Sequence, residues 1–280
     1  MIQHGIPSFL NYDGSFEKNI AVLSVDCKLN NQWKRHLNLF DEVLVFSDYE
    51  KQLLEDSNIQ TNVCGLNRPP MFDSKEMQRF EFNVKGLIFY TNVSLDKKSG
   101  IREIAMAYYS ECSIRDDCIL ILCCTPDNAS KIEELLNEIK VELGIYSNNG
   151  FYPHVGVAPV DDIATMNFMH EKGDYYIDAS YNCRISQNSM SAIRHNSKLI
   201  LLETCRSLFE GEYPLLINSK EEIITYKERP IKNLYTGDST WKVPDVVHLK
   251  SIIRKCCNKE SVDMNIKEFE TNKLEEILCL

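Results

Sequence analysis

Residues 173–203 read GDYYIDASYNCRISQNSMSAIRHNSKLILLE. Two segments, YYIDAS (175–180) and KLILLE (198–203), have the apolar composition of buried strands, and the amphipathic segment between them is typical of a helix. No Asp or Glu occurs between Ser180 and Lys198. The sequence therefore predicts a strand, a turn, a helix and a strand, with no carboxylate in the turn or the helix.

The same alternation continues on both sides of this segment. Other apolar runs of strand length are VKGLIFY (84–90), CILILCC (118–124), HVGVAP (154–159) and YPLLIN (213–218). Strands that are apolar throughout and are separated by amphipathic helices indicate a parallel sheet covered on both faces. We therefore expect residues 71–244 to form a complete, doubly wound Rossmann-like α/β domain. Its ligands should bind at the carboxyl ends of the strands.

The first 70 residues contain fewer strand candidates. They are NIAVLSV (19–25), EVLVFS (42–47) and TNVCGL (61–66). Ser47 and Glu50 have the spacing of a capping box, which predicts a helix start at this point. A full Rossmann-like domain has about six strands, so residues 1–70 are predicted to be a truncated one. The segment NRPPMFD (67–73) marks the boundary.

The carboxyl-terminal part, residues 245–280, begins with the helical pattern DVVHLKSIIRKCCNKE. We expect this helix to return to the amino-terminal domain and to cover its apolar surface. The residues available for that contact are Val246, Val247, Leu249, Ile252 and Ile253.

Composition narrows the range of partners and compartments. The chain has 280 residues, with 31 basic and 41 acidic side chains and a formal charge of −10, which disfavours nucleic-acid binding. It contains no apolar run of about 18 residues that would predict a membrane span, and no secretory signal pattern. A cytoplasmic protein is the expectation.

The 11 cysteines show no C-x-x-C spacing, and most lie in apolar runs. The adjacent pairs Cys123–Cys124 and Cys256–Cys257 have a spacing that rarely chelates one metal ion. Buried, reduced thiols are therefore expected, with no metal and no cofactor.

The loop TNVSLDKKSG (91–100) follows the first strand of the large domain. It offers the hydrogen-bonding side chains of Thr91 and Asn92, and the ammonium groups of Lys97 and Lys98, beside a helix start. Such a loop can bind a diphosphate. A solvated loop without a ligand explains the same residues, because no glycine-rich nucleotide motif is present.

Other polar residues have simpler explanations. Asp161 and Asp162 follow a strand and suit the capping of a helix better than a metal pair. His154, His170 and His195 have no metal-ligand spacing and are expected to be structural or exposed.

The order of these segments resembles the retaining glycosyltransferases of the GT-B fold, especially the family-four group. WKRHLNLFDEVLVFSDYEKQLLEDSNIQTNVCGLNRPP (33–70) is similar to that family's crossover, and DKKSGIREIAMAYYSE (96–111) is similar to its donor loop and the helix that follows. HEKGDYYIDASY (170–181) resembles the segment before the catalytic loop, and STWKVPDVVHLKSII (239–253) resembles the closing segment. The resemblance implies a nucleotide-sugar donor, no required metal, and a diphosphate contact from Lys97 or Lys98.

Two departures from the family pattern are evident. Family members carry E-x7-E after the segment that corresponds to YIDAS, and in this chain those positions fall on Cys183 and Ser191, or on Asn182 and Met190. The resemblance then implies that Asn182, Cys183 and Arg184 line the sugar end of the site, and that Ser180 and Ser191 lie among the donor-binding residues. The second departure is the shortened amino-terminal half.

Three functions remain open from the sequence. The first is a divergent glycosyltransferase that uses a nucleotide sugar and an unknown acceptor. The second is a catalytically inactive relative that binds a partner, with the amino-terminal domain completed by another chain or by self-association. The third is a nucleotide-binding regulator or a sugar-nucleotide epimerase, for which no motif was found.

Overall fold

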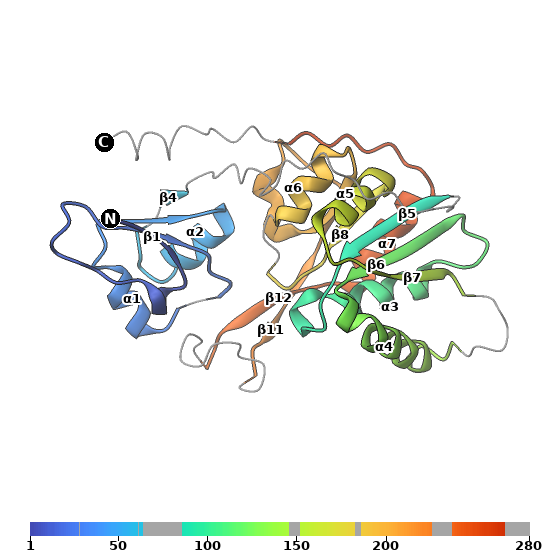
Figure 1. Ribbon diagram of the computed structural model, residues 1–280, viewed down its shortest axis with the longest axis horizontal. Helices are drawn as coiled ribbons and strands as arrows, with labels where there is room; N and C mark the ends of the chain where they lie inside the picture. Colours follow the sequence, from blue (N-terminus) through green and yellow to red (C-terminus); the bar gives the residue numbers. More distant parts are fainter. Residues whose placement is uncertain are drawn as a thin grey trace. The chain divides into compact units, whose positions relative to one another are not determined.

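The computed structural model describes residues 1–27, 29–60, 62–63, 86–145, 152–182, 186–225 and 237–266. The chain divides into two compact units. The first contains strands β1 to β4, and the second contains strands β5 to β10 with the helices that cover them (Figure 1).

The first unit has a parallel sheet of 4 strands in the order β1-β2-β3-β4. The strands are β1 (Ile2–Gly5), β2 (Ile20–Leu23), β3 (Glu42–Val45) and β4 (Asn62–Val63). Helix α1 (Asn31–Leu37) links β2 to β3, and helix α2 (Asp48–Glu55) links β3 to β4. Spatial order follows chain order without a reversal, as in one half of a doubly wound sheet. The expected truncated Rossmann-like domain is confirmed, with β1 as a strand that the sequence analysis did not include.

Ser47 begins α2 as predicted. Its Oγ accepts a hydrogen bond from the Glu50 backbone N at 3.2 Å, and it donates to the Glu50 carboxylate at 3.1 Å. The N-cap hydrogen bond that the capping-box spacing predicts therefore forms, and Glu50 lies at the carboxyl ends of β2 and β3.

The second unit has a parallel sheet of 6 strands in the order β7-β6-β5-β8-β9-β10. The strands are β5 (Leu87–Asn92), β6 (Cys118–Cys124), β7 (His154–Pro159), β8 (Tyr175–Asp178), β9 (Lys198–Leu202) and β10 (Leu216–Ile217). Counted within this unit, the order is 3-2-1-4-5-6, which is that of a Rossmann sheet. The direction of strand addition reverses between β5 and β8, so this pair is the topological switch point.

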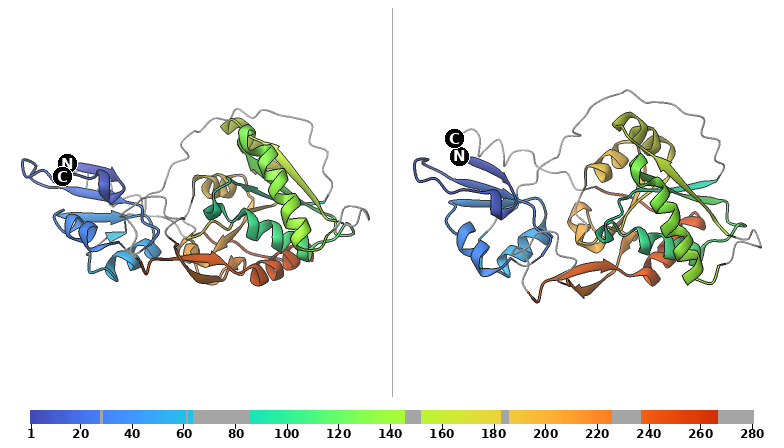
Figure 2. Two further views of the ribbon diagram at one scale, coloured as in Figure 1. Left: turned by 90° about the horizontal axis from the view of Figure 1, so that it is seen from below. Right: turned by 60° about the horizontal axis from the view of Figure 1, so that its bottom comes forward.

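Helices cover both faces of this sheet (Figures 1 and 2). They are α3 (Ile101–Glu111), α4 (Ala129–Glu142), α5 (Ile163–Lys172), α6 (Gln187–Arg194) and α7 (Val246–Cys257). Helix α3 packs against α4 and α7, and α5 packs against α6. The core between sheet and helices is apolar and aromatic, with Phe89, Tyr90 and Tyr108 fully buried.

Helix α7 is part of the second compact unit. Leu249, Ile252 and Ile253 are buried, as the sequence pattern predicts. Within the second unit, α7 packs on α3 and β10. Its end is fixed there by Arg254, whose Nε and Nη1 donate to Glu111 Oε1 and Asp116 Oδ1, both at 2.7 Å.

Two strands form a small separate ladder, β11 (Ser219–Ile223) with β12 (Thr240–Pro244). The expected domain boundary at residues 67–73 lies outside the described residues. Within the part of the chain that the structure describes, no helix has the length and apolar character needed to cross a membrane.

Candidate functional site

The switch point brings two loops to the same edge of the sheet. Strand β5 pairs with β8 through Phe89 with Tyr175 and Tyr90 with Tyr176. Parallel strands end at the same edge, so the loop that follows Asn92 lies beside the loop that follows Asp178. In doubly wound folds, ligands bind in the crevice outside this edge.

The loop after β5 folds into a short 3-10 turn before α3. Asp96 Oδ1 accepts from the Lys98 backbone N at 3.1 Å, and Ser99 Oγ donates to the Ser94 carbonyl at 2.7 Å. This places Lys97 in an exposed position and leaves Lys98 half-buried. Gly100 is the N-cap of α3 and has no side chain to cap its first turn. The positive end of the α3 dipole therefore faces this loop.

Gly100 also allows the two loops to touch. Its φ is +69°, and a Cβ at this position would lie 2.2 Å from the Ala179 carbonyl oxygen. The Tyr181 backbone N donates to the Lys98 carbonyl at 2.8 Å. The β5 and β8 loops are thus joined through their backbones, with glycine required at the contact.

A side-chain pair that the sequence analysis did not anticipate strengthens this junction. Tyr181 OH donates to Glu103 Oε1 at 2.7 Å, and Lys97 Nζ lies 5.9 Å from the Tyr181 ring centroid. Glu103 Oε2 is buried and has no hydrogen-bond partner among the described residues. The sequence feature that could have indicated this contact is Glu103 itself, an acidic residue in the first turn of the helix after the β5 loop.

In the loop after β8, Ser180 is hydrogen-bonded back to the last residue of the strand. The Ser180 backbone N donates to Asp178 Oδ1 at 3.2 Å, and its Oγ donates to the same oxygen. Asn182 has a left-handed φ of +51° and is only 1% exposed. Cys183 and Arg184 lie outside the described residues.

The remaining predicted residues lie at different depths. Thr91 is buried within β5, whereas Asn92 is exposed at its end. Ser191 is half-buried in the middle of α6, and its carbonyl accepts from His195 Nδ1 at 2.9 Å. The start of α6 is capped by Ser186, which accepts from the Ser189 backbone N at 3.0 Å. The structure thus gathers Asn92, Lys97, Lys98 and Ser180 near the switch point and leaves Thr91 and Ser191 away from the surface of the loops.

The aspartates and histidines that were considered as metal ligands have simpler explanations in the structure. Asp162 is the N-cap of α5 and accepts from the Thr165 backbone N at 2.6 Å. This hydrogen bond, together with one from the Thr165 hydroxyl, lowers the pKa of Asp162. His154 is exposed, and His170 is buried against Tyr90. Asp162 therefore caps a helix, His170 packs in the core, and His154 is an exposed side chain.

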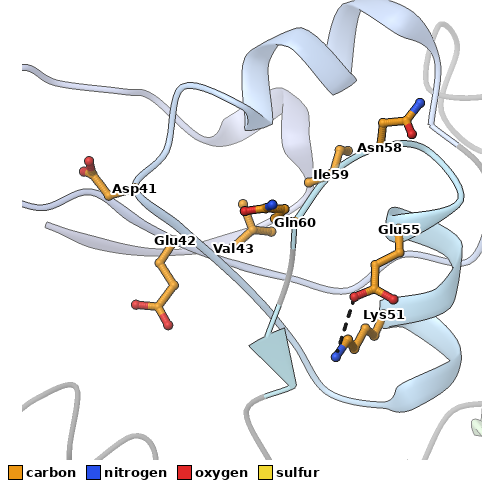
Figure 3. Close-up of a pocket in the computed structure, with 8 residues that line it drawn as sticks. All are labelled: Asp41, Glu42, Val43, Lys51, Glu55, Asn58, Ile59 and Gln60. Carbon is orange, nitrogen blue, oxygen red and sulfur yellow. Dashed lines mark ion pairs between the residues drawn. The ribbon is translucent and has the colours of Figure 1, made fainter.

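A hollow of about 630 Å³ lies in the first unit, at the amino-terminal ends of β3 and β4 (Figure 3). Its lining carries charges that already have partners. Lys51 pairs with Glu55 at 3.6 Å, and Glu42 pairs with Lys18 at 2.9 Å. Doubly wound sheets bind ligands at the opposite, carboxyl edge, so we do not assign the donor site to this hollow.

The sequence matches no known protein family and no curated protein. Solved structures do match. TarM of S. aureus aligns with 86% of this chain and 44% of its own, at a TM-score of 0.53 and 8% identity. The structure of Anabaena HepE aligns with 85% of this chain over 62% of the HepE chain, at a TM-score of 0.52 and 11% sequence identity. A UDP-forming trehalose-phosphate synthase of Burkholderia xenovorans aligns with 85% of this chain over 60% of its own chain. The TM-score is 0.50 and the sequence identity is 10%.

The chain has the GT-B fold. This confirms the expected fold class, a complete Rossmann-like domain together with a truncated one. The TarM and HepE structures were both solved with UDP. The chain spans about half the length of the solved structures that it matches first: the aligned part covers 54%, 51% and 44% of their chains.

Proposed function

We propose that this chain is a divergent glycosyltransferase that takes its sugar from a nucleotide-sugar donor. One observation carries the proposal. The second unit has Rossmann strand order, and its switch-point loops are joined by the contact between Gly100 and Ala179. GT-B neighbours solved with UDP support the same class of donor.

The donor diphosphate would bind between the β5 loop and the amino-terminal turn of α3. Backbone amides at a helix start, together with the helix dipole, favour an anion. Lys97 and Lys98 are the cationic side chains of that loop and can add charge-assisted hydrogen bonds. Asn92, exposed at the end of β5, is placed to contact the same ligand.

The proposed reaction is transfer of the sugar with retention. The bond between the anomeric carbon and the diphosphate oxygen breaks, and the electron pair leaves on the diphosphate. The acceptor oxygen forms the new bond to the anomeric carbon and gives its proton to the departing phosphate oxygen. In this scheme the lysines stabilise the charge that develops on the leaving group, and the protein mainly positions the reactants.

A second candidate is a donor-binding protein without transferase activity. The specific observation in its favour is the absence of Asp and Glu between Ser180 and Lys198. In addition, Asn182 is almost fully buried. The two candidates share a binding site and differ in turnover.

Calorimetry with UDP, GDP and ADP tests the site. Replacing both Lys97 and Lys98 with alanine should weaken binding of the preferred nucleotide by about 1.5–3 kcal/mol for each charged hydrogen bond lost. The matched control replaces Lys131 and Lys172, two exposed lysines of the same unit. Unchanged affinity in the Lys97/Lys98 variant would contradict the proposed site.

A turnover assay then separates the two candidates. Incubation with the matching nucleotide sugar and a panel of acceptors should release nucleoside diphosphate. Binding without release of nucleoside diphosphate would favour the inactive binding protein, and absence of any binding would contradict both.

A further inference from the structure

Three cysteine side chains converge at the edge of the second sheet opposite the candidate donor site. Cys112 follows the last residue of α3, Cys118 is the first residue of β6, and Cys257 is the last residue of α7. Their Sγ atoms all lie within 4.8 Å of one another. All three are free thiols, and Cys257 is the most accessible of them.

The spacing of these sulfur atoms suits a metal ion. Zinc–sulfur bonds are about 2.3 Å long, which puts two sulfurs on one tetrahedral Zn²⁺ about 3.8 Å apart. The observed limit of 4.8 Å accommodates that distance with small side-chain movements. Thiolates are soft ligands that select Zn²⁺ or Cu⁺ over Mg²⁺ and Ca²⁺. Within the described residues, no carboxylate or imidazole belongs to this group.

Hydrogen bonds link the three thiols to one another and to the Tyr108 hydroxyl. Hydrogen bonds from Cys112, then from Cys257 and Tyr108, lower the pKa of Cys118. Tyr108 OH lies 3.5 Å from Cys118 Sγ. The hydrogen bond to Cys118 raises the pKa of Cys112. A thiol must lose its proton to bind a metal ion, so binding of a divalent ion to this cluster should release protons.

The charges around the cluster come from each element that packs against it. Glu111 lies at the end of α3, Asp116 precedes β6, and Arg254 lies one turn before Cys257 on α7. Arg254 pairs with both carboxylates at 2.7 Å. Three thiolates and one Zn²⁺ carry a net charge of −1, and the guanidinium offsets part of it. The same three elements that Arg254 joins would also be joined by the ion.

We propose that Cys112, Cys118 and Cys257 form a structural binding site for one thiophilic metal ion, with Zn²⁺ held by three thiolates and one water. The half-buried Cys257 is the side from which the ion and the water enter. The ion fixes the end of α7 to α3 and β6. It takes no part in sugar transfer, and the site stands whether or not the proposed function holds.

Binding is tested on the full chain, purified with reducing agent and freed of metal by a chelator. Zn²⁺ is titrated in competition with a chromophoric chelator, and Co²⁺ is added to a second sample to detect thiolate-to-cobalt charge transfer. We expect one ion per chain, with affinity that rises with pH because the ligand thiols must lose their protons to bind it. Cys257→Ser should weaken Zn²⁺ binding by at least about a hundredfold.

The matched control is Cys256→Ser, which changes the neighbouring buried thiol outside the cluster. It should bind Zn²⁺ as the unchanged chain does. Because a variant can misfold, alkylation of the unchanged chain gives a second measurement, in which Zn²⁺ should protect Cys257 from iodoacetamide. Equal Zn²⁺ affinity in the two variants, absence of charge transfer, or unprotected Cys257 would each overturn the proposal.

Discussion

Gly100 carries the contact between the two switch-point loops, and its substitution has a specific expected cost. Gly100→Ala introduces left-handed strain of about 1–2 kcal/mol, and it also places a methyl group 2.2 Å from the Ala179 carbonyl oxygen. Gly144→Ala is the matched control, since Gly144 has a φ of +68° and no atom within 4 Å of an added Cβ. Urea denaturation should show a clearly larger loss for Gly100→Ala. Equal losses would mean that the loops separate without penalty.

His170 is a buried histidine whose hydrogen bonds define its neutral form. Tyr90 OH donates to Ser197 Oγ at 2.8 Å, so the Tyr90 oxygen accepts from His170 Nδ1 at 2.9 Å. His170 Nε2 is then an unprotonated nitrogen, buried and without a partner among the described residues. Protonation at Nε2 would bury a charge, and burial lowers the pKa of His170 to about 3.

This lowered pKa makes the free energy of unfolding depend on pH. In the unfolded chain His170 has an ordinary pKa of about 6.5, so below that pH it takes up a proton that the folded chain does not bind. The free energy of unfolding therefore falls as the pH drops from about 6.5 toward 3. Between pH 7 and 5 the loss should be about 2 kcal/mol. His170→Asn keeps a donor near the Nδ1 position and should remove most of this slope in urea titrations. His154→Asn, at an exposed position, should retain it.

At the scale of elements, Glu50 holds the ends of two strands together. Its side chain is fully buried. It accepts from the Val25 and Phe46 backbone N atoms at 3.2 and 3.0 Å, and from Ser24 Oγ at 2.9 Å. The carboxylate therefore joins β2, β3 and the start of α2 in one network.

Removing this carboxylate should destabilise the first unit. Glu50→Ala leaves buried backbone donors without acceptors, at about 1–3 kcal/mol for each group. Glu55→Gln on the same helix removes only an exposed ion pair with Lys51 and should cost less than about 1 kcal/mol. Chemical denaturation of both variants measures the difference. A Glu50→Ala chain as stable as Glu55→Gln would contradict the network's role.

The elements were largely predictable from sequence, and the exceptions have physical reasons. Apolar runs and helical periodicity located β2, β3 and β5 to β10, because these strands are apolar in sequence and most of them are buried. Strand β1 was missed because IQHG alternates exposed and half-buried residues at a sheet edge. A return of α7 to the first unit stays a prediction.

The candidate site was predictable only in part. The loop at residues 91–100 and its lysines followed from strand order, which places them at the ligand edge. The link from Tyr181 to Glu103 joins residues 78 positions apart, and no local pattern specifies such a pair. The cluster of Cys112, Cys118 and Cys257 was missed for the same reason. Roles for Cys183 and Arg184 stay predictions.

For the whole molecule, two compact units with separate buried cores imply two unfolding events. Glu50→Ala should lower the midpoint of one transition in a denaturant titration, and Gly100→Ala should lower the midpoint of the other. Fluorescence and far-UV circular dichroism together can resolve the two steps. A single transition shifted equally by both variants would show that the units unfold as one.

Because α7 packs on α3, the apolar face of α3 stays uncovered during synthesis until α7 has been made. The last strand of the large sheet ends at Ile217, but its covering helix ends forty residues later, at Cys257. Ribosomes add about 5–20 residues per second, so synthesis of α7 is complete about 2–8 s after the last strand of the sheet has been made. During that interval the nascent chain presents an apolar helix face to chaperones and to neighbouring chains. Slow codons between residues 218 and 257 would lengthen this exposure without changing a single amino acid.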